Sequence, residues 1–155
     1  MGTRSNRQGE TQLLAEWLTT QCAGAQSKTH VFVGSQTLVF NGQPLSPAMM
    51  KAFSVWSDWV DARVAWPSEV WVVEAKIVGI AGAYGQALDY AAQYQGSLDY
   101  QSFLGRRIVP MVVCAYERPR TAGLFAGFGV RTVVYTPAWA AKSLSVKIQG
   151  STIDI

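Results

Sequence analysis

The stretch that decides the fold is residues 60–78, VDARVAWPSEVWVVEAKIV. Residues 60–65 and 70–78 are apolar and rich in β-branched side chains, and Trp66-Pro67-Ser68-Glu69 separates them. Two β-branched runs on either side of a proline-containing turn are typical of a β-hairpin. Charged groups on an otherwise buried strand are usually paired, exposed or bound to metal, because their desolvation is costly. Asp61, Glu74 and Lys76 therefore need a physical explanation.

The turn of this hairpin determines which of these charged side chains lie opposite each other. Side chains alternate along a strand, so Glu74 and Lys76 point to the same face of the second strand. Pro67 fits the second position of a four-residue type I turn. A turn centred directly after Pro67 places Asp61 opposite Glu74, whereas a loop one residue longer would move Asp61 to the other face.

Two opposed carboxylates indicate a cation. Directly opposed residues on antiparallel strands have Cβ atoms roughly 4.5–5.5 Å apart, and carboxylates at that distance repel each other unless a cation lies between them. Their oxygens, with the carbonyl of Ala75, form a hard donor set that suits Mg²⁺ or Mn²⁺. Lys76 could orient a metal-bound water or neutralise charge on a phosphoryl group. The alternative, which a Glu-x-Lys motif alone favours, is a salt-bridge cluster of Asp61, Glu74 and Lys76 at an exposed strand end.

N-terminal to the hairpin, residues 8–20 have the spacing of an amphipathic helix, capped by Ser5 or Asn6. Its apolar face consists of Leu13, Leu14, Trp17 and Leu18. At about 100° per residue Glu10 lies on this inward face, whereas Glu16 lies on the other side and is expected in solvent. Glu10 is either a metal ligand or a carboxylate placed for the helix dipole, and the sequence favours neither interpretation.

C-terminal to the hairpin, residues 83–95 also have helical spacing. Gln86, Tyr90 and Tyr94 form one stripe of this helix, at i, i+4 and i+8. Gln86 could donate a hydrogen bond to a phosphate or to an attacking water. The structural alternative is a tyrosine stripe that closes the core, with Gln86 at its edge.

The remaining segments complete an α/β protein. We expect strands at residues 30–40, 107–116 and 131–135, and short helices from Pro47 to about Trp56 and over residues 121–129. The first of these strands ends at Asn41-Gly42. With the hairpin, these elements predict a single domain over residues 1–155. Its centre is a mixed sheet of about four to five strands flanked by helices.

The composition excludes several classes of site. One His and two Cys cannot build a closed four-ligand zinc site without carboxylates, and Ser-His-Asp or Cys-His chemistry would need His30. We expect His30, at the head of a strand, to be structural, because nothing in the sequence places it near the acids. Cys22 and Cys114 are expected to be reduced and packed, as in a cytosolic protein. The longest apolar run, residues 108–116, is far below membrane-spanning length, so no membrane partner is predicted.

The net charge of +3 is unevenly distributed. Residues 1–104 carry six Lys/Arg against eight Asp/Glu, and residues 105–155 carry seven against two. An acidic half followed by a basic half suits a site that holds divalent cations beside a polyanion. Arg106 and Arg107, at a strand end, are candidates for phosphate contacts that position DNA, or else are solvated surface charge.

Taken in order, these motifs resemble those of the PD-(D/E)XK nuclease superfamily, which has the restriction-endonuclease-like fold. The matching positions are Glu10, Asp61, Glu74 with Lys76, and Gln86 with Tyr90, and the resemblance spans about residues 10–135. Asp61 follows Val60, where the family pattern has Pro. The chain is also similar to small proteins of tailed bacteriophages that share Asp-Ala, a Pro-containing turn and Glu-Ala-Lys-Ile.

The resemblance implies an αβββαβ core and an enzyme, a metal-dependent nuclease that hydrolyses DNA phosphodiester bonds with Mg²⁺ or Mn²⁺. It implies catalytic roles for Asp61, Glu74, Lys76 and Gln86, metal ligation by Asp61, Glu74 and Glu10, and DNA contacts by Arg106, Arg107 and Tyr90. The implied partners are DNA and either further copies of the chain or a phage assembly, in the host cytoplasm or the virion. The alternative is a phage structural or assembly protein of the head, neck or tail that keeps this fold as a scaffold.

Overall fold

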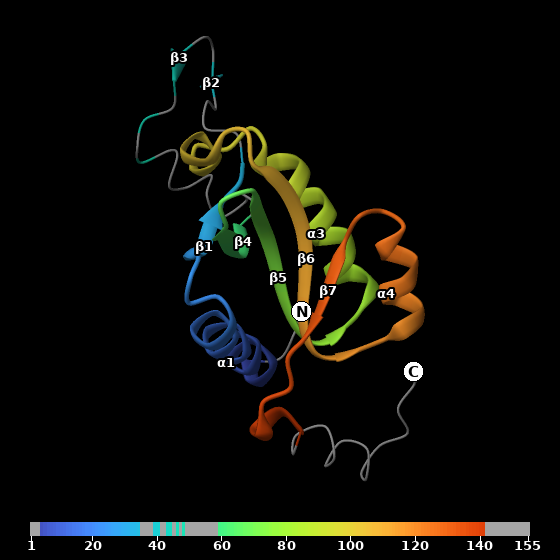
Figure 1. Ribbon diagram of the computed structural model, residues 1–155. Helices are drawn as coiled ribbons and strands as arrows, with labels where there is room; N and C mark the ends of the chain where they lie inside the picture. The colour runs from blue at the N-terminus through green and yellow to red at the C-terminus, as the bar shows by residue number, and fades with distance from the viewer. Residues whose placement is uncertain are drawn as a thin grey trace.

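The computed structural model describes residues 4–34, 39–40, 43–44, 46, 48 and 59–141 (Figure 1). In chain order the elements are α1 (Arg4–Gln21), β1 (Gln26–Phe32), β2 (Val39–Phe40), β3 (Gln43–Pro44), β4 (Trp59–Ala65), β5 (Glu69–Gly79), α3 (Ala81–Tyr94), the 3₁₀ helix η1 (Asp99–Phe103), β6 (Arg107–Glu117), α4 (Pro119–Ala126) and β7 (Arg131–Val134). The predicted α/β fold is confirmed, with a mixed five-stranded sheet flanked by helices.

The sheet has the strand order β1-β4-β5-β6-β7. The pairs β1/β4 and β4/β5 are antiparallel, whereas β5/β6 and β6/β7 are parallel. Parallel neighbours need a crossover connection, and α3 and α4 lie in the two crossovers. β2 and β3 form a separate antiparallel pair. The long strand β5 is therefore the central strand, between β4 and β6 (Figure 1).

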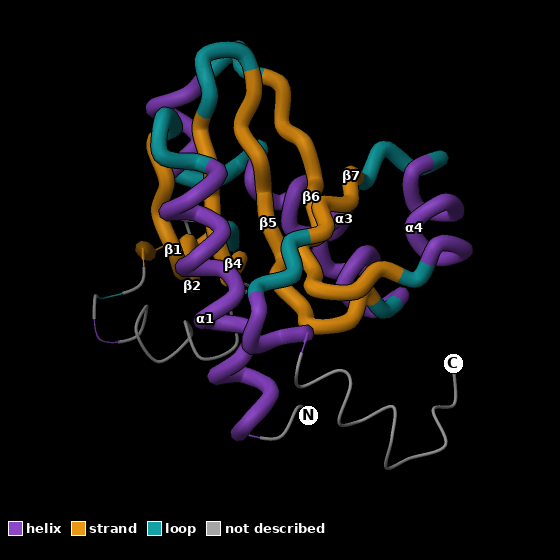
Figure 2. Tube along the Cα trace, turned by 60° about the horizontal axis from the view of Figure 1, so that its bottom comes forward, coloured by secondary structure: helices purple, strands orange, loops and turns teal. Residues whose placement is uncertain are grey.

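Helices cover both faces of β5. On one face Val73 packs with Leu14 and Trp17 of α1. On the other face Val72 packs with Tyr94 of α3. Figures 1 and 2 show α1 and α3 on opposite sides of the sheet. Because both faces are buried, residues 70–73 of β5 form a continuous apolar run rather than an alternating one.

The predicted hairpin is confirmed in its register. Ala62 of β4 pairs with Val73 of β5, as a turn centred directly after Pro67 requires. The N–H of Trp66 donates to the carbonyl oxygen of Glu69 at 2.8 Å and closes the turn. The short turn fixes which residues of the two strands face each other.

The first helix and the first strand both begin earlier than predicted. α1 already begins at Arg4, so residues 5 and 6, predicted as its cap, lie inside the helix. The strand predicted at residues 30–40 instead spans residues 26–32, most of whose side chains are exposed. A solvent-facing edge strand lacks the apolar alternation that would reveal it.

The remaining predictions concern two short helices, a turn, the cysteines and membrane-spanning segments. The helix predicted at residues 121–129 is α4, which begins two residues earlier because Pro119 suits the start of a helix. The Asn41-Gly42 turn lies outside the described residues, as does the helix predicted at residues 47–56 apart from its second residue. Cys22 and Cys114 are buried and free, as predicted. In the described part of the chain, no helix has the length and apolarity to cross a membrane.

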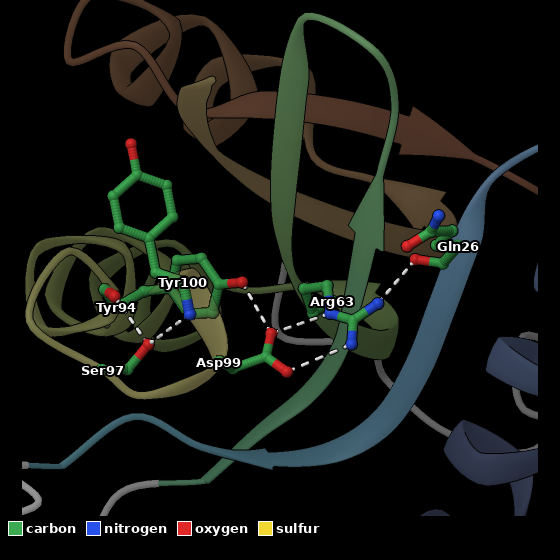
Figure 3. A network of polar contacts seen from close by, with 6 residues as sticks. All are labelled: Gln26, Arg63, Tyr94, Ser97, Asp99 and Tyr100. Carbon is green, nitrogen blue, oxygen red and sulfur yellow. Dashed lines mark hydrogen bonds and ion pairs between the residues drawn. The ribbon is translucent and has the colours of Figure 1, made fainter. Parts of the chain in front are cut away.

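A buried ion pair ties the hairpin to neighbouring elements (Figure 3). Arg63 of β4 donates to both carboxylate oxygens of Asp99, at 2.8 and 3.1 Å, and to the carbonyl oxygen of Gln26 at 2.7 Å. The hydroxyl of Tyr94 donates to the same carboxylate at 2.6 Å. Burial opposes ionisation of Asp99, but the hydrogen bonds from Arg63 and Tyr94 hold its pKa below the ordinary value. This network fixes β4 two residues away from Asp61.

Candidate functional site

Asp61 and Glu74 lie together where the β4/β5 ladder ends. The last ladder pair is Ala62 with Val73, and the same register continued by one residue sets Asp61 opposite Glu74. The Asp61 Oδ2 atom accepts a hydrogen bond from the backbone N–H of Ala75 at 2.9 Å. One oxygen of Asp61 thus takes the place of a ladder carbonyl, and the two carboxyl groups face each other as predicted.

Glu74 is buried, and its carboxyl group lacks a full set of hydrogen-bond partners. Only 5% of its surface is exposed, and its Oε1 atom has no hydrogen-bond partner. Burial, and then the negative charge of Asp61, raise the pKa of Glu74 from 4.5 to about 9. A carboxyl group with that pKa holds a proton at neutral pH until a cation replaces it.

Lys76 pairs with Glu10 of α1 rather than with either hairpin acid. Its Nζ atom lies 3.4 Å from Oε1 and 3.5 Å from Oε2 of Glu10. The two side chains are 29% and 22% exposed. Burial raises the pKa of Glu10, although the ammonium group of Lys76 opposes the shift. Glu10 therefore faces inward, as its place on the helix predicts.

Glu16, which was expected in solvent, is half-buried. Its carboxylate accepts a hydrogen bond from the indole N–H of Trp139, at 3.0 Å to one oxygen and 3.2 Å to the other. The segment after β7 brings Trp139 against α1, close to Gly9. Sequence periodicity within α1 gives no signal for that distant contact. Glu16 lies outside the cavity that Glu10 lines, so Glu10 is the first-helix acid of the site.

A cavity of about 670 Å³ brings the predicted site residues together. It lies between α1, β1, β4, β5 and α3. Six predicted residues line it: Glu10, Asp61, Glu74, Lys76, Gln86 and Tyr90. Gln86 is exposed and Tyr90 half-buried. Tyr94, the third residue of the predicted stripe, is instead buried in the core with its hydroxyl on Asp99.

The structure does not bring Arg106 and Arg107 to this cavity. The β5/β6 register pairs Arg107 with Glu69, five residues before Glu74, so the separation along the strand is roughly 16 Å. Arg106 donates to the carbonyl oxygen of Trp66 at 3.0 Å, beside the hairpin turn. Arg107 lines a second, more open hollow of about 530 Å³ next to α4 and β7.

Sequence reasoning missed several residues of the cavity, among them Arg7 and His30. Arg7 lies one turn before Glu10 on α1, and i,i+3 spacing could have identified it. Nothing in the sequence places His30 near the acids, but it also lines the cavity. The flanking pairs of β1 and β4 set His30 opposite Asp61. That neighbour depends on a long-range strand pairing with no local signal.

The donor set fits a divalent cation held by two carboxylates. No group of three His, Cys, Asp or Glu side chains with metal-binding spacing occurs within the described ranges, and the carboxylate of Glu10 is engaged by Lys76. Mg²⁺ commonly uses one or two carboxylates, keeps several waters and contacts phosphates. The unpartnered, buried Oε1 of Glu74 beside Asp61 is a donor of this kind. Asp61 and Glu74 are therefore the residues that could hold such an ion.

The cavity also brings charges of both signs together. Its acids are Glu10, Asp61 and Glu74, and its basic side chains are Arg7 and Lys76. Such a site can bind a cation and an anionic group at once. No protein-family model, curated protein or solved structure matches this chain.

Proposed function

We propose that the protein is a metal-dependent nuclease that hydrolyses DNA phosphodiester bonds. The observation that carries this proposal is the buried Glu74 carboxyl group, opposed by Asp61 and left with an unpartnered oxygen. A structural salt-bridge cluster would pair Glu74 with Lys76. Instead Lys76 pairs with Glu10, and Glu74 is left to a proton or a metal.

Asp61 and Glu74 would hold Mg²⁺ or Mn²⁺, with Glu10 as a further candidate ligand. Such an ion polarises a phosphoryl oxygen and lowers the pKa of a bound water. Lys76 is a point charge that can donate to a phosphate oxygen and stabilise the charge that develops there. Glu10 keeps the ammonium group of Lys76 in position at 3.4 Å.

Two further side chains of the cavity have roles in this proposal. Gln86, exposed on α3, can donate its amide to a phosphate oxygen or orient the attacking water. Arg7, exposed on α1, provides positive charge at the same cavity and attracts the DNA backbone. Tyr90 supplies an aromatic wall beside Gln86.

The second candidate function is that of a phage structural or assembly protein with this fold as its scaffold. The observation that favours it is the group of exposed apolar side chains on α4, the loop after it and the edge strand β7. Leu124 and Phe128 are 63% and 65% exposed, and Val134 is 49% exposed. Such side chains suit contacts with further copies of the chain or with a phage assembly. A scaffold would not need Asp61 or Glu74.

The direct test is cleavage of supercoiled plasmid, linear duplex, single-stranded DNA and RNA, each with Mg²⁺ or Mn²⁺ and with EDTA. We expect metal-dependent cleavage of DNA that falls about 100-fold or more in Asp61→Asn and Glu74→Gln. Asp89→Asn is the matched control, because Asp89 is an exposed carboxylate of α3 outside the cavity. A wild-type protein that cuts no DNA, or only RNA, would contradict the proposal, as would full activity in Glu74→Gln.

A further inference from the structure

His30 and Trp59 form an aromatic stack in the wall of the cavity. Their ring centroids are 4.2 Å apart, and the rings are within 6° of parallel. Phe32 lies on Trp59 at 5.3 Å, tilted by 52°. Both His30 and Trp59 line the cavity that contains Asp61 and Glu74. Flat aromatic surface therefore lies beside the acid pair.

The backbone of His30 is strained. Its φ angle is +55°, and within the described ranges no other residue except glycine has a positive φ. A left-handed conformation costs a non-glycine residue about 1–2 kcal/mol. The pairs Thr29/Ala62 and Val31/Val60 keep the register on both sides, so the distortion is confined to this one residue. Strain that the neighbouring strand pairs maintain is typical of functional positions.

Exposure separates this stack from ordinary core packing. The largest apolar side chains of the core, such as Trp17 and Tyr84, are almost fully buried. His30, in contrast, is exposed although its ring lies flat on Trp59. The indole supports one face of the imidazole, and the exposed side chain adjoins the cavity.

We propose that the His30–Trp59 stack is a platform for an unpaired DNA base next to the scissile phosphate. This inference rests on the proposed nuclease function and names its substrate: DNA that is single-stranded at the point of cleavage. Bases stack on aromatic side chains at about 1–3 kcal/mol each, with little dependence on sequence. A base inside a duplex is already stacked on its neighbours and must leave the helix to use such a surface.

The charges around the cavity favour binding of single-stranded DNA over binding of a long duplex. Among the described residues that line it, Arg7 and Lys76 provide positive charge against three acids, and Lys76 is already paired with Glu10. Tight non-specific binding of duplex DNA relies on many phosphate contacts. The arginines at residues 106 and 107 lie at the other end of the β5/β6 pair. Stacking of a base on the aromatic rings can therefore contribute affinity for DNA close to the acids.

The test uses a short single-stranded oligonucleotide that carries the fluorescent base 2-aminopurine, with Ca²⁺ and separately with EDTA. Stacking quenches the fluorescence of this base, and titration gives the dissociation constant. We expect His30→Asn to weaken binding about five-fold or more and to reduce the quenching, whereas His30→Phe keeps a flat ring and retains both. Asparagine tolerates the left-handed conformation, so the first variant should fold, and thermal melting verifies this.

Phe128→Ala is the control, because Phe128 is an exposed aromatic residue on the loop after α4, outside the cavity. It should bind the oligonucleotide as the wild type does. The proposed platform is contradicted if a folded His30→Asn variant binds the oligonucleotide and quenches its fluorescence as the wild type does. It is also contradicted if the wild type binds no single-stranded DNA, with Ca²⁺ or with EDTA. Neither result would contradict the proposed metal-dependent cleavage. Conversely, if the protein cleaves no DNA but quenching still requires His30, the nuclease function is rejected. The stack would then bind an unpaired base without a role in cleavage.

Discussion

Asp61 and Glu74 oppose each other across β4 and β5, but their oxygens are not equally satisfied. Asp61 accepts the N–H of Ala75 at 2.9 Å, whereas the Oε1 atom of Glu74 is buried without a partner. A buried carboxyl group beside a like charge must take up a proton or a cation. The pH dependence of stability and of metal binding should therefore both depend on Glu74.

Glu74→Gln should change how stability depends on pH in EDTA. The pKa of Glu74 is about 9 in the folded protein and 4.5 ordinarily, so folding takes up a proton between these values. This contribution to stability is complete below pH 4.5 and is lost as pH rises through the folded value, by at most about 1.4 kcal/mol per pH unit. Glutamine is neutral throughout. Relative to the wild type, the variant should gain stability from pH 5 to pH 9.

Chemical denaturation at several pH values measures this difference. Asp89→Asn, which removes an exposed carboxylate, should keep the wild-type pH dependence. Parallel pH profiles for Glu74→Gln and the wild type would mean that Glu74 is ionised in the folded protein.

Metal binding at neutral pH should release about one proton per ion, because the cation displaces the proton of Glu74. Calorimetric titration with Mn²⁺ in two buffers of different ionisation enthalpy measures the number of protons. Asp61→Asn and Glu74→Gln should abolish binding. Glu16→Gln, on the same helix as Glu10 but hydrogen-bonded to Trp139, should bind normally. Binding that survives in Glu74→Gln would place the ion elsewhere.

Lys76→Met should separate catalysis from stability. The ion pair of Lys76 with Glu10 is partly exposed, so its loss should change the free energy of unfolding by about 1 kcal/mol or less. The rate of DNA cleavage under single-turnover conditions should fall about 100-fold, because a charge close to the phosphate is removed. Lys28→Met removes an exposed lysine of β1 and serves as the control. Cleavage by Lys76→Met at the wild-type rate would exclude the proposed role.

Asp99→Asn should destabilise the protein by about 3 kcal/mol at neutral pH, because it leaves Arg63 buried without its counter-charge. Arg63 and Tyr94 hold the pKa of Asp99 below 3.8. Its contribution is therefore present above that value and is lost as pH falls through the lower folded pKa. The difference in free energy of unfolding between wild type and variant should therefore become smaller at acidic pH. Denaturation at neutral and acidic pH measures it, and a loss below about 1 kcal/mol at neutral pH would show that the network is dispensable.

The parts of the site that could be predicted from the sequence depend on local geometry. The four-residue turn at Pro67 fixes the hairpin register, and alternation along β5 places Glu74 and Lys76 on one face. Helical periodicity turns Glu10 inward. Each inference needs only neighbours within one helix or hairpin, where spacing determines direction.

The parts that could not be predicted depend on long-range contacts. His30 meets the acids only because β1 pairs with β4, and the exposed residues of β1 carry no apolar pattern. Glu16 is covered by Trp139, which lies more than 100 residues away. The basic charge of residues 105–155 does not reveal which end of the sheet Arg106 and Arg107 occupy.

In the proposed function, Asp61 and Glu74 together hold the divalent cation that DNA hydrolysis requires. Anomalous diffraction from crystals soaked in Mn²⁺ at pH 8 tests it most directly. We predict a single strong peak within coordination distance of a carboxylate oxygen of each residue, absent from Glu74→Gln crystals. A map with no peak at this pair, or with Mn²⁺ bound only elsewhere, would contradict the claim.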